Sequence, residues 1–220
     1  MAIQIQGNSG TVVEVDGITF RAMRVTSRPV EYGALGIYRI SMITGTMAAG
    51  LASSSEIFQV RWTDATRLAL IWGLTVDGFG SATGFANGFS NISMTIARNW
   101  SADGSGGSAA TLTGDNQKMR TSMGTSLMGA IRISTTAALV AGTKTLDAQA
   151  IAQVTMSLNN VANTQFLPPA TTVYGNLEDG GNPIPIVLVQ NEGIVGRATV
   201  PATGTWQAGI TMSWAEVTSY

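Results

Sequence analysis

The sequence predicts an all-β protein: a jelly-roll-like antiparallel β-sandwich in a single domain, with a long loop excursion at its centre. Three observations lead to this fold class. Apolar residues recur at every second position in most segments, which is the period of a strand with one buried face. Turn residues separate these segments at intervals of about a dozen residues, a spacing typical of sandwiches and barrels. The chain has 220 residues, 45% of them hydrophobic, which is enough to fill one large core.

The predicted order begins with an N-terminal arm, residues 1–10, which carries Ile3 and Ile5. Residues 11–220 are assigned to the sandwich. Its first two strands are expected to form a hairpin that turns at residues 16–17, because an Asp-Gly dipeptide favours a tight turn.

The next four predicted strands differ in how many of their faces are apolar. Three of them alternate apolar and polar residues, whereas the strand near residue 72 is apolar on both faces, as expected of a strand covered on both sides. The predicted apolar faces carry Tyr38, Ile40 and Met42 (opposite Arg39 and Ser41); Phe58, Val60 and Trp62 (opposite Gln59 and Arg61); Leu68, Leu70, Trp72, Leu74 and Val76 (opposite Ala69 and Ile71); and Ile92, Met94 and Ile96, closed by Arg98.

Residues 100–130 interrupt this rhythm with a segment rich in Gly, Ser and Met. The segment lacks the Gly-Lys-Ser/Thr ending of a phosphate-binding loop and the ligand spacing of an EF-hand, so a surface excursion is expected. Met119, Met123 and Leu127 recur at helical spacing and predict a short helical patch, weakened by Gly124. Long excursions often contact neighbouring molecules, so these three residues, together with Ile3 and Ile5, are the predicted interface.

Strands resume after the excursion in the sequences GAIRIST, AIAQVTMSL, PIPIVLVQ and GIVGRATV, the last two joined by an apparent hairpin turn at residues 191–193. The final strand has the clearest pattern in the chain. It is predicted to close the core, since burying one Trp contributes up to about 4 to 6 kcal/mol. Stacking of its two tryptophans on sugar rings is the less favoured alternative. The alternating residues are Trp206, Ala208, Ile210, Met212 and Trp214.

The composition excludes several classes of function. Charged residues make up only 11% of the chain, against about 25% in an ordinary soluble domain, which favours a surface covered by self-association or by partners. A net charge of −1 without a basic run gives no electrostatic footprint for nucleic acid.

The sequence shows no signal peptide and no apolar run of about 18 residues, so neither secretion nor a membrane partner is expected. Without Cys or His, thiolate or imidazole metal sites and the common nucleophile–base pairs are impossible, and no cofactor is expected.

Carboxylate chemistry is the enzymatic possibility that remains. A glycosidase needs two carboxylates facing each other across a cleft, and Glu56 with Glu216 would serve if their strands were neighbours. Most of the thirteen acidic residues lie at predicted strand ends or beside glycine, which is typical of surface and turn positions. The sequence therefore predicts a protein that is not an enzyme.

Two segments resemble small structural proteins of tailed bacteriophages. The C-terminal sequence NEGIVGRATVPATGTWQAGITMSWAEV follows the apolar PIVLVQ, and its NEG turn, ATG turn and final strand ending in W-x-E are similar to those proteins. The sequence ISMTIARNWSADGSGGSAATLTGDNQKMRTSMGTS resembles their central segment, in which an arginine–aromatic pair precedes a Ser/Gly-rich loop. The resemblance implies a jelly-roll or related β-sandwich module on the virion and implies no catalytic residues.

The function expected from these observations is that of a virion structural protein, made in the host cytoplasm. It is expected to be a capsid decoration or cement subunit that forms a homotrimer and contacts the phage capsid protein. A tail, neck or baseplate component and a glycan- or receptor-binding module of a phage fibre are the alternatives. A bacterial filament or surface-layer subunit is a weaker one, since it would need an export route.

Overall fold

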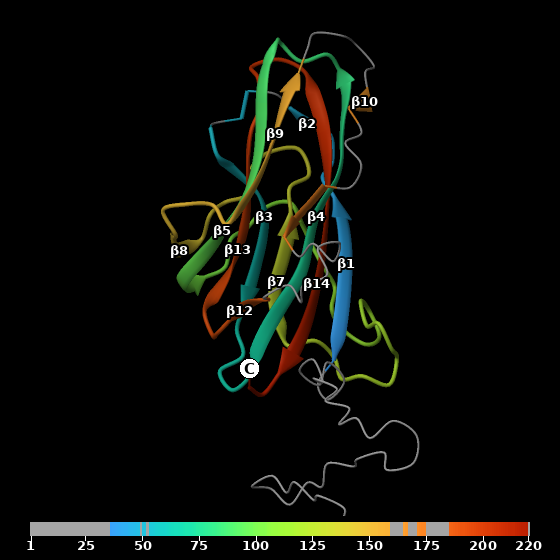
Figure 1. Cartoon of the computed structure of the whole chain (residues 1–220), viewed down its shortest axis with the longest axis vertical. Coiled ribbons are helices and arrows are strands. Elements are labelled where there is room, and N and C mark those ends of the chain that lie inside the picture. Colours follow the sequence, from blue (N-terminus) through green and yellow to red (C-terminus); the bar gives the residue numbers. More distant parts are fainter. Residues whose placement is uncertain are drawn as a thin grey trace, which may run out of the picture. The chain divides into compact units, whose positions relative to one another are not determined.

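Two antiparallel β-sheets pack face to face in the computed structural model, which describes residues 36–48, 50–51, 53–158, 165–166, 171–174 and 185–219 (Figure 1). These residues contain no helix. The predicted all-β antiparallel sandwich is therefore confirmed. Ile3, Ile5 and the predicted hairpin at residues 16–17 lie outside the described residues.

Among the described residues, each sheet has seven strands. Consecutive strands repeatedly change sheet, for example from β3 to β4 to β5, a connectivity compatible with a jelly roll. The first sheet contains β1 (Ile37–Ile43), β2 (Met47–Ala48), β4 (Leu68–Thr83), β10 (Gln165–Phe166), β11 (Thr171–Tyr174), β12 (Ile186–Leu188) and β14 (Thr205–Val217). The second contains β3 (Ser55–Trp62), β5 (Gly88–Ala102), β6 (Ser108–Ala109), β7 (Met128–Ile133), β8 (Thr143–Leu146), β9 (Ala152–Leu158) and β13 (Glu192–Thr199).

The core between the sheets is built on the alternation of β14. Its alternating residues from Trp206 to Trp214 are all buried in one hydrophobic cluster, as predicted. Trp214 stacks on Tyr38 of β1 with ring centroids 5.3 Å apart. Because both tryptophans are buried in the core, neither ring presents a face on which a sugar could stack.

A β-bulge makes the predicted face of β4 wrong. Gly73 lies opposite Ser213, but Ile71 lies opposite Trp214, so Trp72 is an extra residue in the ladder. The extra residue reverses the alternation: Ala69 and Ile71 face the core before it, and Leu74 and Val76 face the core after it.

The predicted hairpin at residues 191–193 is also wrong, because the two strands it would join lie in different sheets. β12 pairs with β4, whereas β13 pairs with β3 and β5. The turn is tight, with the N–H of Glu192 donating to the C=O of Val189 at 3.0 Å, and Asn191 has a positive φ of 64°. Turn residues fix the local reversal of the chain but not which sheet the next strand joins.

The outer face of the second sheet is also covered. The sequence predicted a polar face for β3 on this side, where Gln59 and Arg61 lie. Gln59 is buried there, and its amide donates to Glu56 at 2.6 Å and to the C=O of Val140 at 3.0 Å. Nearby, Trp100 packs with Ala97, Val195 and Leu146 in a second, smaller hydrophobic cluster. Residues of the segment between β7 and β9 thus form an additional layer over this sheet.

A buried ion pair holds this segment against the sheet. The Lys144 ammonium contacts the Glu56 carboxylate at 2.8 Å, with side-chain exposures of 2% and 11%. It also donates to the C=O of Ala141 and lies 4.6 Å from the centre of the Trp100 ring. The cation therefore joins β8 to β3 and β5.

We expect the Trp214→Ala substitution to lower the free energy of unfolding by about 3 to 5 kcal/mol, because it removes a buried aromatic ring and its stacking partner for Tyr38. Val140→Ala, at a position 61% exposed, is the control and should change stability by less than about 0.5 kcal/mol. Denaturant unfolding followed by Trp fluorescence and circular dichroism measures both. Equal losses in the two variants would contradict the assigned core.

Lys144→Met should destabilise the protein by about 3 to 5 kcal/mol, because it leaves the Glu56 carboxylate buried without its cation. Adding Glu56→Gln should recover part of that loss. The matched control is Lys118→Met, because Lys118 pairs with the exposed Asp115 and should cost less than about 1 kcal/mol. The same unfolding experiment is used, and a double variant no more stable than Lys144→Met would show that the ion pair is not the cause.

Candidate functional site

Strand β1 forms one edge of the first sheet (Figure 1). β14 pairs with it along its inner side over the whole strand. In an antiparallel ladder, alternate residues turn their N–H and C=O groups to the same side. Since the N–H of Arg39 bonds outward, to a loop, the backbone groups of Ser41 and Ile43 face the same open side.

The segment between β6 and β7 covers the first half of this edge. The N–H of Arg39 donates to the C=O of Gln117 at 3.1 Å, and the N–H of Met119 donates to the C=O of Ile37 at 3.0 Å. Beyond Arg39, no strand among the described residues pairs with the outer side of Ser41–Ile43. With respect to the described part of the chain, that short stretch of backbone is an open sheet edge.

Two further contacts hold the covering segment against β1. The Tyr38 hydroxyl donates to the C=O of Gly124 at 2.8 Å. The sulfur of Met123 accepts the N–H of Ile37 at 3.1 Å. The position of this segment therefore depends on side chains from both partners.

The buried carboxylate of Glu216, on β14, anchors the end of the same segment. It accepts hydrogen bonds from the hydroxyl of Ser126 at 2.6 Å, the N–H of Leu127 at 3.0 Å and the indole of Trp214 at 3.3 Å. Burial raises the pKa of Glu216 above its ordinary value of about 4.5, and these bonds only partly offset that effect. Burial, and then the charge of Glu216, raises the pKa of Tyr38 to about 12.

The structure places the predicted interface residues of the excursion in different surroundings. Met119 is 59% exposed beside β1. Met123 and Leu127 are half-buried, and Leu127 packs against the core. The predicted helical patch is wrong: Met119 and Met123 lie at bends on either side of a turn, and Leu127 follows in irregular chain that leads into β7.

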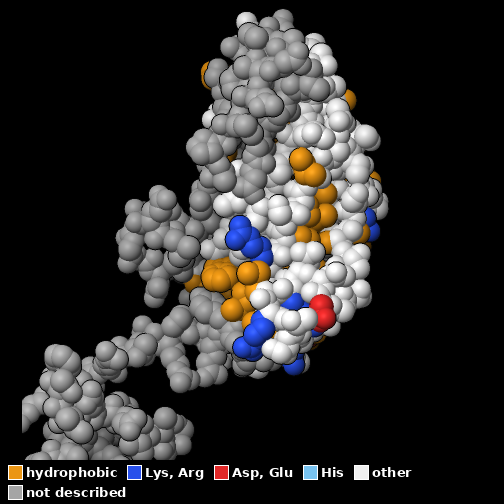
Figure 2. Space-filling view, turned by 90° about the vertical axis from the view of Figure 1, so that its right-hand side faces the viewer, with side chains coloured by type: hydrophobic (Ala, Val, Ile, Leu, Met, Phe, Trp, Pro, Cys, Tyr) orange, Lys and Arg blue, Asp and Glu red, His pale blue; other side chains and the backbone are white. Residues whose placement is uncertain are grey.

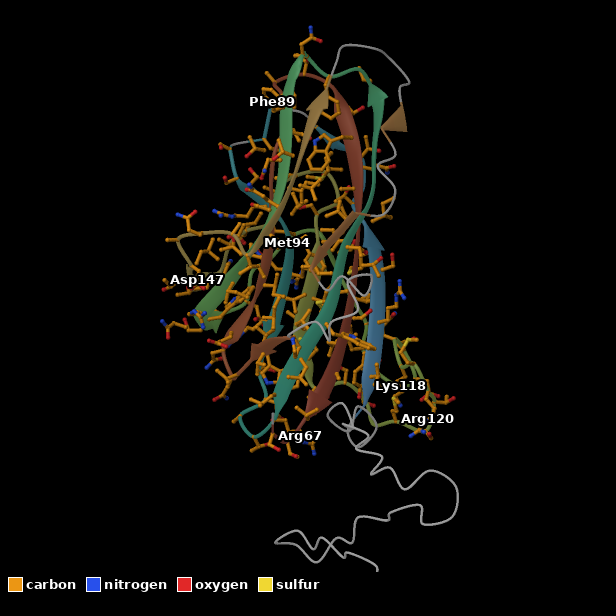
Figure 3. All side chains as sticks on the ribbon, in the orientation of Figure 1. Arg67, Phe89, Met94, Lys118, Arg120 and Asp147 are labelled. Atoms are coloured by element: carbon orange, nitrogen blue, oxygen red, sulfur yellow. The ribbon has the colours of Figure 1, made fainter. Side chains whose placement is uncertain are left out.

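Basic and apolar side chains together line this side of the molecule. A space-filling view shows groups of hydrophobic side chains with Lys and Arg side chains beside them (Figure 2). Ile43 is 64% exposed. Lys118 and Arg120 belong to the covering segment (Figure 3), and the Lys118 side chain, only 8% exposed, pairs with Asp115 at 2.9 Å. Arg39 and Arg120 are exposed, and neither forms an ion pair with a described residue.

We call the open stretch Ser41–Ile43, together with Arg39, Met119 and Arg120, the β1-edge surface. Sequence reasoning identified Met119 but missed Arg39 and Ile43 as members. The sequence did carry a signal for Ile43, because this residue shares the exposed face of its strand with Arg39 and Ser41. A large apolar residue on an otherwise polar face indicates a contact made by that face.

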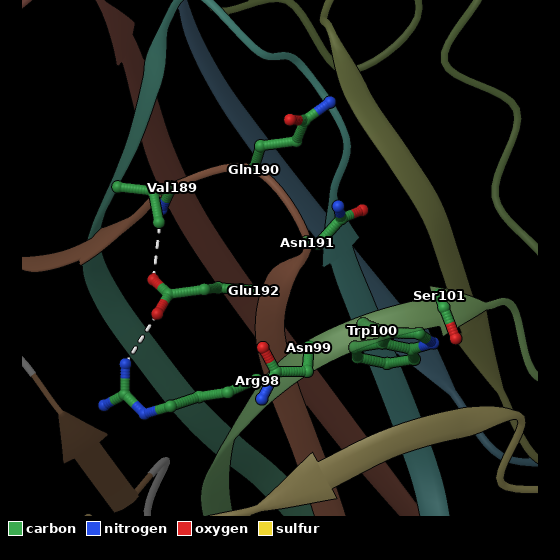
Figure 4. Close-up of a pocket in the computed structure, with 8 residues that line it drawn as sticks. All are labelled: Arg98, Asn99, Trp100, Ser101, Val189, Gln190, Asn191 and Glu192. Carbon is green, nitrogen blue, oxygen red and sulfur yellow. Dashed lines mark hydrogen bonds and ion pairs between the residues drawn. The ribbon is translucent and has the colours of Figure 1, made fainter.

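A second candidate site is a pocket of about 420 Å³ at one end of the second sheet (Figure 4). Arg98 forms ion pairs with Asp147 at 2.9 Å and with Glu192 at 2.5 Å. These contacts raise the pKa of Arg98, with Asp147 as the main cause, so the guanidinium stays charged. The remaining lining is mostly uncharged: Asn99, Trp100, Ser101, Val189, Gln190 and Asn191.

The carboxylate pair considered for glycoside hydrolysis does not form. Glu56 lies on β3 in the second sheet and Glu216 on β14 in the first, so their strands are not neighbours. Each is engaged elsewhere: Glu56 with Lys144, and Glu216 with the chain at Ser126. Glu216 is also 1% exposed, which corrects the expectation of a surface or turn position. Within the described ranges, no three Asp or Glu side chains gather in a group that could hold a metal ion.

Comparison with known proteins found no relative of this chain. No family model matches the chain, and neither a curated protein nor a solved structure is significantly similar to it. In the part of the chain that the structure describes, no helix is long and apolar enough to span a bilayer.

The raised pKa of Glu216 predicts how Glu216→Gln changes the pH dependence of stability. From about pH 4.5 up to the raised pKa, the native carboxyl keeps a proton that the unfolded chain has lost, so the carboxyl's contribution to stability falls as pH rises. The Gln variant lacks this titration. We therefore expect its stability relative to the wild type to increase between pH 4 and pH 7, measured by denaturant unfolding at each pH.

Asp115→Asn is the control for this experiment, because Asp115 is 66% exposed on its side chain and its pairing with Lys118 is solvent-screened. Its stability relative to the wild type should change little over the same pH interval. If the stability of Glu216→Gln relative to the wild type stayed constant or fell as pH rose, Glu216 would not be a buried carboxylate with a raised pKa.

Proposed function

We propose that this chain is a structural subunit that works by assembly, and that it is a capsid decoration or cement protein of a tailed bacteriophage, located on the virion. The observation that carries the assembly part is the β1-edge surface, in which an open backbone edge lies beside the exposed Ile43. Open edges with apolar side chains pair readily with other chains, and proteins that stay monomeric usually block them.

The low charge of the chain supports the same proposal. Only 11% of the residues are charged, so few side chains oppose association. The phage and capsid part rests on the sequence resemblance of the central and C-terminal segments. A homotrimer that contacts the capsid protein is the form we propose, and a tail, neck or baseplate location is the alternative within the same class.

The proposed mechanism is mass action. A subunit that binds only the assembled, expanded shell lowers the free energy of that state relative to every other state. At a free concentration 100 times the dissociation constant, each bound subunit contributes about 2.7 kcal/mol. Many such sites on one shell would add to a large total without any catalytic step.

The pocket at Arg98 supports a second candidate, a glycan- or receptor-binding module. Amide side chains of Asn99, Gln190 and Asn191 are suited to hydrogen bonding with sugar hydroxyls. Trp100 is only 1% exposed, so stacking would contribute little. A glycan screen tests this function, and binding weakened by Asn99→Ala would favour it over the decoration role.

The main test of the proposal is the mass of the chain in solution, measured by light scattering behind a sizing column. We expect a concentration-independent trimer of three 22.9 kDa chains. We also expect co-sedimentation with expanded, empty heads of tailed phages and not with unexpanded heads. Ile43→Asp should weaken both properties, whereas Val140→Asp, at an equally exposed position, should leave them unchanged. A monomer that binds no shell would contradict the proposal.

A further inference from the structure

The open stretch of β1 has a side-chain pattern that restricts which strand can pair with it. On the outer face, the order from Arg39 through Ser41 to Ile43 is basic, small polar and apolar. On the inner face, Ile40 is buried and Met42 is half-buried against the core. A complementary strand must therefore carry apolar residues on one face, and on the other an acidic residue at one end and an apolar residue at the opposite end.

One segment outside the described residues has this pattern. Residues 12–16 read Val-Val-Glu-Val-Asp. In antiparallel register, Glu14 falls opposite Ser41 and Val12 opposite Ile43. Asp16 then follows at the end of the open edge, on the same face as Arg39, because Gln117 already holds the backbone position opposite Arg39. The inner positions then match Val15 with Ile40 and Val13 with Met42.

The alternatives fit less well. A parallel orientation would place Asp16 beside Ile43 and leave Arg39 beside Val12. Residues 2–6 alternate Ile with Gln and offer no charge to Arg39, while residues 18–24 would bring Arg21 or Arg24 to the same basic surface.

The length of the open edge also matches. The loop at Gln117 occupies the ladder at Arg39, so an added strand has to leave the sheet there. Residues 16–17 are an Asp-Gly dipeptide, which favours a tight turn at that point. The segment can thus end where the edge ends.

We propose that the open edge of β1 binds residues 12–16 of a second copy of this chain as an added antiparallel strand, with Asp16 paired to Arg39. This proposal rests on the proposed function in assembly and names the partner at the β1-edge surface. Each copy then contributes one edge and one strand, and a ring of copies in which every edge is filled leaves no open edge.

Cysteine cross-linking tests the register, because the chain contains no cysteine of its own. Val12→Cys and Ile43→Cys are made as separate variants and mixed before mild oxidation. Directly opposite residues of an antiparallel pair have Cα atoms about 4.5 to 5.5 Å apart, within reach of a disulfide. A covalent dimer containing one chain of each variant is the expected result. Mixing Val12→Cys with Val140→Cys is the matched control and should yield no such dimer.

Charge exchange tests the ion pair. Arg39→Asp should raise the dissociation constant of the oligomer about tenfold, because it places two acidic side chains close together on the same face. Adding Asp16→Arg to the same chain should restore assembly. Arg120→Asp is the control for the same charge change at an exposed residue near the edge but off the proposed register, and it should have a smaller effect that Asp16→Arg does not rescue.

The outcomes separate this proposal from the proposed function. A wild-type oligomer that binds shells but gives no Val12–Ile43 cross-link between variants would overturn the strand assignment and leave the assembly function standing. A doubly substituted chain that forms only an internal disulfide would overturn the assignment to a second copy. A monomeric wild type without shell binding would overturn both proposals.

Discussion

The pairing of β14 with both β1 and β4 is the constraint on which the described structure depends. β14 lies between these strands, and every core-facing residue from Trp206 to Trp214 is buried against the second sheet. Because β14 keeps an unbroken alternation, the irregularities fall on its partner β4, whose ladder with β14 contains three register shifts. The longest strands of the first sheet can therefore adjust to each other without moving a tryptophan out of the core.

Of the strands that the structure describes, β14 alone pairs with β1. The loop that covers part of β1 is held by residues of the core. Glu216 of β14 accepts a hydrogen bond from Ser126 in this loop. Trp214, also on β14, stacks on Tyr38, whose hydroxyl donates to the C=O of Gly124 in the same loop. Burying a carboxylate lowers the stability of the fold, since desolvation opposes its charge. Its hydrogen bonds nevertheless give the loop one defined position, which sets where the covered part of the edge stops.

The strands whose faces could be predicted are those with regular alternation, such as β1 and β14. The bulge at Trp72 could not be predicted, because both faces of β4 are apolar and either phase fits the sequence equally well. The crossing from β12 to β13 was missed for another reason: turn chemistry is local, and sheet membership is set by distant partners. Glu216 looked like a surface residue because a charged side chain reveals nothing in sequence about the groups that bind it. In the candidate site, Met119 was found from loop composition, whereas Arg39 and Ile43 needed the sheet order.

A protein with few charges has few means of blocking a sheet edge. Lysines, inward-pointing charges and prolines are the usual devices, and here the covering loop, with Met119 and Lys118, protects only the first half of β1. Beyond it lies Ile43, whose exposure would favour uncontrolled edge-to-edge association in an isolated chain. Two copies that paired antiparallel over Ser41–Ile43 would give Arg39 no acidic neighbour, because Arg39 is the only charged residue of β1. An acidic strand is attracted by the same side chain, so the arginine favours an acidic strand over a second copy of the same edge.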